Sequence, residues 1–196
     1  MLGHGQGWCL DLACGGGRHA AAIQATGYTV VGLDLSAGQL RVARRRLRHL
    51  VQADVTRLPV GDAVVGAVVL AYAHTDVDDI APVFAEVGRV LRPGGRLVFL
   101  GVHPCFVGHF VEYREADAQV VLHAGYRKAG WHLDSPYFSP GGLGRRVGAR
   151  HVPLAELLNA LLAAGLRLQR VEEFGGDLDQ GHVPRDLALV AAKPPA

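Results

Sequence analysis

Two stretches near the start of the chain carry residues that can hold a nucleotide-like molecule. Residues 8–18 (WCLDLACGGGR) form an apolar run that ends in a glycine turn, and residues 30–36 (VVGLDLS) form an apolar run that ends in the acid Asp34. Glycine lets the backbone approach a ligand closely because it has no Cβ. An acid at the end of the next strand can accept hydrogen bonds from ribose hydroxyls. Together they predict a site for an adenosine-containing small molecule.

A strand, a helix and a second strand must position these residues. The pattern predicts a first strand over about 8–13, a helix over about 17–26 and a second strand over about 29–34. Ser36 then suits the N-cap of a helix that runs to about residue 49. Both apolar runs would end at the same edge of a parallel sheet, where ligands bind in such folds.

The residues around the glycine turn distinguish between adenosine ligands. The spacing Gly15-x-Gly17-x-x-Ala20 also matches the dinucleotide pattern, which by itself is a weak signal. Asp11, however, precedes Gly15 by four residues. A carboxylate beside the turn suits a cationic aminoacyl group better than a pyrophosphate, because like charges repel at close range.

Two later stretches complete an ordered set of motifs. They are residues 52–55 (QADV) and 91–99 (LRPGGRLVF). In order and spacing the four stretches resemble the motifs of class I S-adenosylmethionine-dependent methyltransferases of the bacterial small-molecule type, over nearly the whole chain from Trp8 to about Ala192. Ala13 stands where the family usually has its first glycine, and alanine is small enough that we expect the loop to survive.

The resemblance implies which residues bind S-adenosylmethionine. Asp34 would accept from both ribose hydroxyls, Leu35 would pack near the adenine, Asp54 would accept from the adenine amino group and the Val55 amide would donate to the ring. The methionine part would be lined by Asp11, Ala13, Gly15 and Gly17, and the backbone carbonyl of Ala71 would accept from the cofactor amine.

Some of these residues have simpler interpretations. Asp54 can cap a turn, and Asp34 can simply be a polar residue of a loop that binds no ligand. Arg18 and His19, at the first turn of a helix, are placed to reach the cofactor carboxylate, since a helix N-terminus favours an anion. Solvent exposure is the alternative for both.

Candidates for the acceptor side follow the fourth apolar run, in residues 71–76 (AYAHTD). We expect Tyr72 to contact the substrate. His74 is the candidate catalytic base, because an imidazole has a pKa near the physiological range. Packing over the adenine or capping the next helix is the simpler role for His74.

The long segment 103–150 is rich in histidine and aromatic residues, which argues against disorder. We interpret it as a cap over the acceptor pocket, with Pro140–Gly144 as its mobile part. His103 and Tyr137 from this segment, and His151 directly after it, are the remaining substrate candidates; His151 can also simply begin a helix. The spacing His103-x-Cys105-x-x-x-His109 lacks an evident fourth ligand, so we expect no metal site.

The remaining elements extend the alternation of strands and helices. Strands are predicted over about 50–53, 64–72 and 96–102, with a helix capped by Asp76 or Asp78 and ending near Leu91. A late helix over 153–164 precedes two strands over 166–173 and 185–192 that must pair antiparallel. The expected fold class is α/β, a Rossmann-like doubly wound sheet. The resemblance implies seven strands, with the last antiparallel beside the fifth.

Composition places limits on partners and location. The chain has 196 residues, 49% of them hydrophobic, and a net charge of +2, which favours a single domain over residues 1–196 and gives no support for nucleic acid or a membrane surface. We interpret the arginines within residues 41–48 as the solvent-exposed face of a helix. Three cysteines form no disulfide framework, and residues 1–7 lack an apolar stretch, so we expect a cytoplasmic protein without a membrane span. A homodimer is left open.

These observations predict an enzyme that moves a methyl group from S-adenosylmethionine to an oxygen, nitrogen or carbon of a small metabolite by in-line displacement. Two alternatives remain. An NAD(P)-dependent oxidoreductase is suggested by the Gly15 pattern with Asp34. A non-catalytic partner subunit of another methyltransferase is suggested because only seven residues precede Trp8, where family members usually have a closing helical segment.

Overall fold

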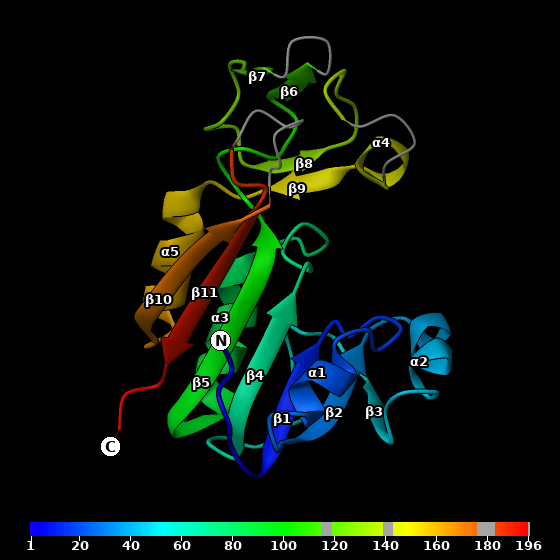
Figure 1. The fold of residues 1–196 in the computed structure, drawn as a ribbon, viewed down its shortest axis with the longest axis vertical. Helices are drawn as coiled ribbons and strands as arrows, with labels where there is room; N and C mark the ends of the chain where they lie inside the picture. The colour runs from blue at the N-terminus through cyan, green and yellow to red at the C-terminus, as the bar shows by residue number, and fades with distance from the viewer. Residues whose placement is uncertain (115–118, 139–142, 176–182, 196) are drawn as a thin grey trace.

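A parallel sheet organises the molecule. The computed structural model describes residues 1–114, 119–138, 143–175 and 183–195. The strands of the main sheet are β1 (Trp8–Leu12), β2 (Thr29–Asp34), β3 (His49–Gln52), β4 (Val65–Ala71), β5 (Leu91–Val102), β10 (Arg167–Phe174) and β11 (Asp186–Ala192). Their order across the sheet is β10-β11-β5-β4-β1-β2-β3 (Figure 1).

The pairing confirms the predicted α/β class. β1 pairs in parallel with β2 and β4, β2 with β3, and β4 with β5. β11 runs antiparallel to both β5 and β10, so the last strand is inserted beside the fifth as expected. Gly165, with a φ of 74°, ends the preceding helix and turns the chain into β10.

Helices cover both faces of the sheet. One face carries α1 (Ala20–Gln24), whose Ala20 and Ile23 pack with Cys9 and Val30 of the sheet. The opposite face carries α3 (Ile80–Val90) and α5 (Leu154–Ala163), which share one buried core with the strands. β4 is buried from Val65 to Leu70, as its nearly continuous apolar run predicts for a central strand between two helical layers.

Helix boundaries differ from the sequence prediction in three places. Ser36 does cap α2 (Ala37–Ala43), accepting from the Gln39 amide, but this helix ends well before residue 49. α1 begins later than predicted because Gly17 has a φ of 74°, which a right-handed helix cannot contain. Asp79, rather than Asp76 or Asp78, caps α3, because only Asp79 directly precedes Ile80 in an extended conformation.

The segment between β5 and α5 lies beyond the carboxyl end of the sheet (Figure 1). Two small antiparallel pairs form it: β6 (Val111–Arg114) with β7 (Gln119–Leu122), and β8 (Gly130–His132) with β9 (Ala149–His151). A short helix, α4 (Leu143–Val147), precedes β9. Pro140–Gly144, the predicted mobile part, lies largely outside the described residues. No helix among the described residues is long and apolar enough to cross a membrane.

Candidate functional site

An acidic cavity of about 720 Å³ opens where β1, β2 and β4 end. Its wall includes Ala13 and Gly15 from the glycine turn, Leu35 after β2, and Ala53 and Val55 after β3. Five aspartates line it: Asp34, Asp54, Asp76, Asp78 and Asp79. Within the described part of the chain, no lysine, arginine or histidine lines this cavity. Such a wall favours a ligand that carries positive charge.

Asp34 ties the glycine turn to the second strand. Its Oδ2 accepts from the Gly15 amide and its Oδ1 from the Ser36 amide, both at 2.8 Å. The Gly16 carbonyl accepts from the Arg46 guanidinium at 2.9 Å, so one member of the arginine run secures the turn. The carboxylate of Asp34 keeps further lone pairs for a ligand, because an ionised carboxylate has about four acceptor sites.

Ala13 occupies a position that favours glycine. Its φ is 50°, in the left-handed region where a Cβ is strained. Gly15 and Gly17, with φ values of 52° and 74°, meet the same requirement without strain. The loop therefore keeps the glycine-type conformation despite its alanine.

The Ala13→Gly variant is expected to leave the structure of the turn unchanged. Relief of the left-handed alanine should stabilise the fold, partly offset by the greater flexibility of glycine when unfolded, for a net gain below about 1 kcal/mol. Urea unfolding would measure this. A loss of more than about 1 kcal/mol would contradict the assigned backbone conformation.

The stretch after β3 contributes a carboxylate that is already part of a turn. Asp54 Oδ1 accepts from the Thr56 amide and hydroxyl, at 2.8 and 2.7 Å. These hydrogen bonds lower the pKa of Asp54. Asp54 thus has the turn-capping contact considered above and also faces the acidic cavity.

Asp11, on β1, is buried and is not part of the described wall of the acidic cavity. Its side chain is 1% exposed, and its Oδ2 has no hydrogen-bond partner among the described residues. Burial, and secondly the charge of Asp34, raises the pKa of Asp11 to about 7. A buried acceptor of this kind is uncommon and often marks a place where a ligand or ion acts.

Several other residues predicted to bind the cofactor do not line the acidic cavity. Gly17, Arg18, His19 and Ala71 are absent from the described wall of the acidic cavity, whereas Tyr72, predicted on the substrate side, is part of it. Tyr72 has a φ of 56°, and its hydroxyl donates to Asp186 at 3.0 Å. A bulky residue in the left-handed region is rare and often occurs at functional sites.

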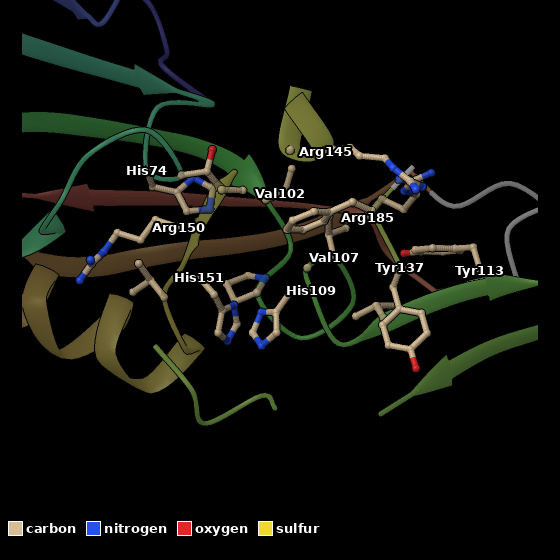
Figure 2. Close-up of a pocket in the computed structure, with 18 residues that line it drawn as sticks. His74, Val102, Val107, His109, Tyr113, Tyr137, Arg145, Arg150, His151 and Arg185 are labelled. Carbon is tan, nitrogen blue, oxygen red and sulfur yellow. The ribbon is translucent and has the colours of Figure 1, made fainter. Parts of the chain in front are cut away.

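A second cavity, of about 220 Å³, lies between the sheet and the segment beyond it. We call it the cap pocket (Figure 2). His74 after β4, Val102 at the end of β5 and Arg185 before β11 contribute from the sheet side. Tyr137 and His151, both predicted as substrate residues, also line it.

Three histidines line the described wall of the cap pocket: His74, His109 and His151. His74 is 3% exposed, its Nδ1 has no hydrogen-bond partner among the described residues, and its ring meets Phe99 edge-on at 5.2 Å. Gly101 leaves room for it, because a Cβ there would lie 2.3 Å from His74 Cε1. His109 stacks on His132 with centroids 3.3 Å apart, and the Nε2 of His151 donates to the Tyr126 carbonyl.

The imidazoles of His74, His109 and His151 are uncharged at physiological pH. Burial, and secondly His151, lowers the pKa of His74 to about 4. Burial with His132 and His151 lowers the pKa of His109 to about 4, and burial lowers that of His151. The positive charge of the cap pocket therefore comes from its arginines.

We expect acid to destabilise the protein through His74. The unfolded chain takes up a proton near pH 6.5 but the folded chain only near 4, so stability present above pH 6.5 is lost as the pH falls to 4. This loss is on the order of 3 kcal/mol. Urea unfolding at pH 7.5 and 4.5 would measure the loss of stability between the two pH values. The His74→Phe variant should lose less stability than the original protein, and His4→Phe, at an exposed control position, should lose as much. Equal losses in all three proteins would refute the assignment.

His103, predicted to contact the substrate, does not line the described wall of the cap pocket. Its Nδ1 accepts from the Cys105 amide at 3.1 Å, and its Nε2 therefore carries a proton and donates to Glu173 at 2.7 Å. The ring thus links the segment after β5 to β10. Cys105 approaches the Tyr126 hydroxyl instead, and the described residues include no group of three metal-ligating side chains.

Some cavity residues were missed in the sequence. Arg145 lines the cap pocket from the segment beyond the sheet, and Arg185 lines it from the position directly before β11. In the acidic cavity, Gln39 was missed. Ala73 belongs to the stretch 71–76 that was predicted on the acceptor side, and it lines the acidic cavity. Nothing local in the sequence distinguishes Arg145 from its neighbour Arg146.

The chain is similar to known methyltransferases. Residues 10–99 match a family model described as a methyltransferase domain. A demethylmenaquinone methyltransferase from Clavibacter sepedonicus is 43% identical over 94 residues, which cover 45% of this chain and 38% of that protein. The chain thus spans well under two thirds of the length of the curated relatives that it matches.

Solved structures resemble the chain over nearly its full length. An S-adenosylmethionine dependent methyltransferase from Mesorhizobium loti superposes with a TM-score of 0.77 at 25% identity, covering 97% of this chain and 92% of that one. Geranyl diphosphate C-methyltransferase from Streptomyces coelicolor A3(2), solved with S-adenosyl-L-homocysteine, has a TM-score of 0.69 at 15% identity, covering 98% and 75%.

Proposed function

We propose that this chain is a class I S-adenosylmethionine-dependent methyltransferase and that it transfers a methyl group from S-adenosylmethionine to a small organic acceptor. One observation carries the proposal. The short stretch after β4 borders both cavities, with Tyr72 and Ala73 in the wall of the acidic cavity and His74 and Thr75 in that of the cap pocket. A donor in the first and an acceptor in the second would meet across these four residues.

The acidic cavity suits the proposed cofactor. Its aspartates match a cationic ligand and would repel the pyrophosphate of a dinucleotide, which disfavours the oxidoreductase alternative. Asp34 would accept from the ribose hydroxyls, and Asp54 with the Val55 amide would bind the adenine beside Leu35. Ala13, Gly15 and the buried Asp11 would face the aminoacyl part.

The chain's own residues would orient the reactants and exclude water. S-adenosylmethionine supplies an electrophilic methyl group on a sulfonium, so the protein needs mainly to align an acceptor for in-line displacement. His74 is uncharged at physiological pH. Its imidazole can therefore accept a hydrogen bond from an acceptor hydroxyl or amine, but its lowered pKa makes it a weaker base than the sequence predicted.

The acceptor of the relatives does not transfer to this chain. Apart from His74 and Thr75, the described wall of the cap pocket consists of residues from 102 onward, outside the matched segment 10–99. Binding pockets on a shared fold vary independently of that fold.

Segment 103–150 would serve as the cap of a single domain. Cytoplasmic location, a homodimer and the lack of a nucleic-acid or membrane partner stay predictions.

Calorimetric titration with S-adenosylhomocysteine, and with NADH in parallel, tests the proposal. Micromolar binding of the first ligand alone is expected, followed by transfer of labelled methyl from S-adenosylmethionine to a member of an acceptor panel. Binding of NADH alone would overturn the assignment. Binding of S-adenosylhomocysteine without transfer to any acceptor would favour the non-catalytic alternative.

A further inference from the structure

The two cavities differ in charge. The described wall of the acidic cavity holds five aspartates and no basic residue. The described wall of the cap pocket holds three arginines and no aspartate or glutamate. Low-dielectric walls lined by one sign of charge attract ligands of the opposite sign. A cationic methyl donor accounts for the first cavity, and the second therefore calls for an anionic acceptor.

The arginine charge is concentrated at one end of the cap pocket. In Figure 2 the guanidinium groups of Arg145 and Arg185 point to the end where Tyr113 and Tyr137 lie, whereas His74 lies toward the other end and Arg150 points away. Arg185 lies over the Tyr113 ring at 4.6 Å. Arg145 has no ion-pair partner in the part of the chain that the structure describes. Both arginines line the pocket wall, and their positive charge favours an anionic ligand at this end.

The rest of the pocket limits the size and character of the ligand. Val102, Val107, Val111 and Phe138 supply apolar parts of the pocket wall. Its volume of about 220 Å³ is below the range of about 300–1,000 Å³ typical of pockets for drug-sized ligands. This fits a single substituted ring or fused ring pair rather than a long chain.

We propose that Arg145 and Arg185 bind a carboxylate of the methyl acceptor, and that the acceptor is a compact aromatic acid whose methylated atom faces His74. The unpartnered, buried Nδ1 of His74 is an independent sign that this cavity receives a polar ligand. Arginine suits this role because its planar fork matches a carboxylate. The proposal deepens the proposed function, on which it rests, by naming the class of acceptor.

Matched ligand pairs test the charge requirement. Benzoate, cinnamate and indole-3-carboxylate, each beside its primary amide, would be titrated into the protein with and without saturating S-adenosylhomocysteine. Each amide keeps the shape of its acid and removes only the charge. At least one acid is expected to bind about tenfold or more tightly than its amide. Absence of binding by every acid at millimolar concentration, or equal binding of acids and amides, would overturn the proposal.

Variants localise the effect. Arg145→Gln and Arg185→Gln should each reduce the acid preference to below about threefold, while Arg145→Lys and Arg185→Lys retain part of it. Arg146→Gln is the matched control, because Arg146 is exposed on α4 like its neighbour Arg145 but does not line the pocket. Melting temperatures would show whether each variant folds. If both glutamine variants fold and still bind the acids more tightly than the amides, the proposal is overturned.

The outcomes separate this inference from the proposed function. If S-adenosylhomocysteine binds but acids are not preferred, the methyltransferase proposal stands and the carboxylate site fails. If S-adenosylhomocysteine does not bind but the acids are preferred and the preference depends on Arg145, the carboxylate site stands and the proposed donor fails.

Discussion

Replacement of Asp34 by alanine is expected to weaken binding of S-adenosylhomocysteine by at least about 100-fold. The carboxylate accepts from the Gly15 and Ser36 amides while facing the acidic cavity. Its removal leaves two backbone donors without their acceptor and, under the proposed function, the ribose without one as well. Hydrogen bonds to a charged group contribute about 1.5–3 kcal/mol each, so loss of two to the ligand accounts for the expected effect. Calorimetric titration at pH 7.5 would measure it.

Two controls separate recognition from folding. Asp134→Ala changes an exposed carboxylate outside both cavities and should leave the affinity unaltered. Asp34→Asn keeps one oxygen acceptor for the Gly15 or Ser36 amide, so it should fold better than the alanine variant and still bind weakly. If Asp34→Ala bound the ligand as tightly as the original protein, the ribose would have to lie elsewhere.

Asp11→Asn is expected to stabilise the protein at alkaline pH by on the order of 4 kcal/mol. The folded-state pKa of Asp11 is about 7, against an ordinary value of 3.8. Between these pH values the folded chain holds a proton that the unfolded chain releases, so stability falls as the pH rises from about 4 to about 7. Asparagine resembles the protonated acid and avoids this loss. The gap between the two proteins should narrow to roughly 1–2 kcal/mol at pH 5.

Urea unfolding at pH 5 and pH 8.5 would measure the gap, with Asp134→Asn as an exposed control. A gap that does not change with pH would mean that Asp11 is not a buried acid of raised pKa. The variant also tests the proposed role of Asp11 beside the aminoacyl group. If the carboxylate offsets the positive charge of the cofactor, Asp11→Asn binds S-adenosylhomocysteine less tightly while it folds more stably. Such a trade between stability and function is common at active sites.

Local patterns in the sequence were sufficient for the sheet and for part of the acidic cavity. The apolar run of β4, the Ser36 cap and the glycine turn each depend on a few consecutive residues, so their types predict their structure. Because parallel strands end at one edge, Asp34 and Asp54 could be placed near Gly15 before their contacts were known. The choice of Asp79 over Asp76 and Asp78 depended on where α3 begins, which the composition of that stretch leaves ambiguous.

Only the tertiary structure decided the cap pocket. His103 and His151 are alike in the sequence, yet Glu173 of β10 holds the first outside the pocket wall and the second lies in it. Arg145 and Arg185 are 40 positions apart and meet the same cavity from α4 and from the position directly before β11. The sequence by itself determined the α/β class and several residues of the acidic cavity wall, because their signals are local and periodic. The acceptor side depended on contacts between distant segments, since side-chain direction and burial there arise from packing that no local pattern encodes.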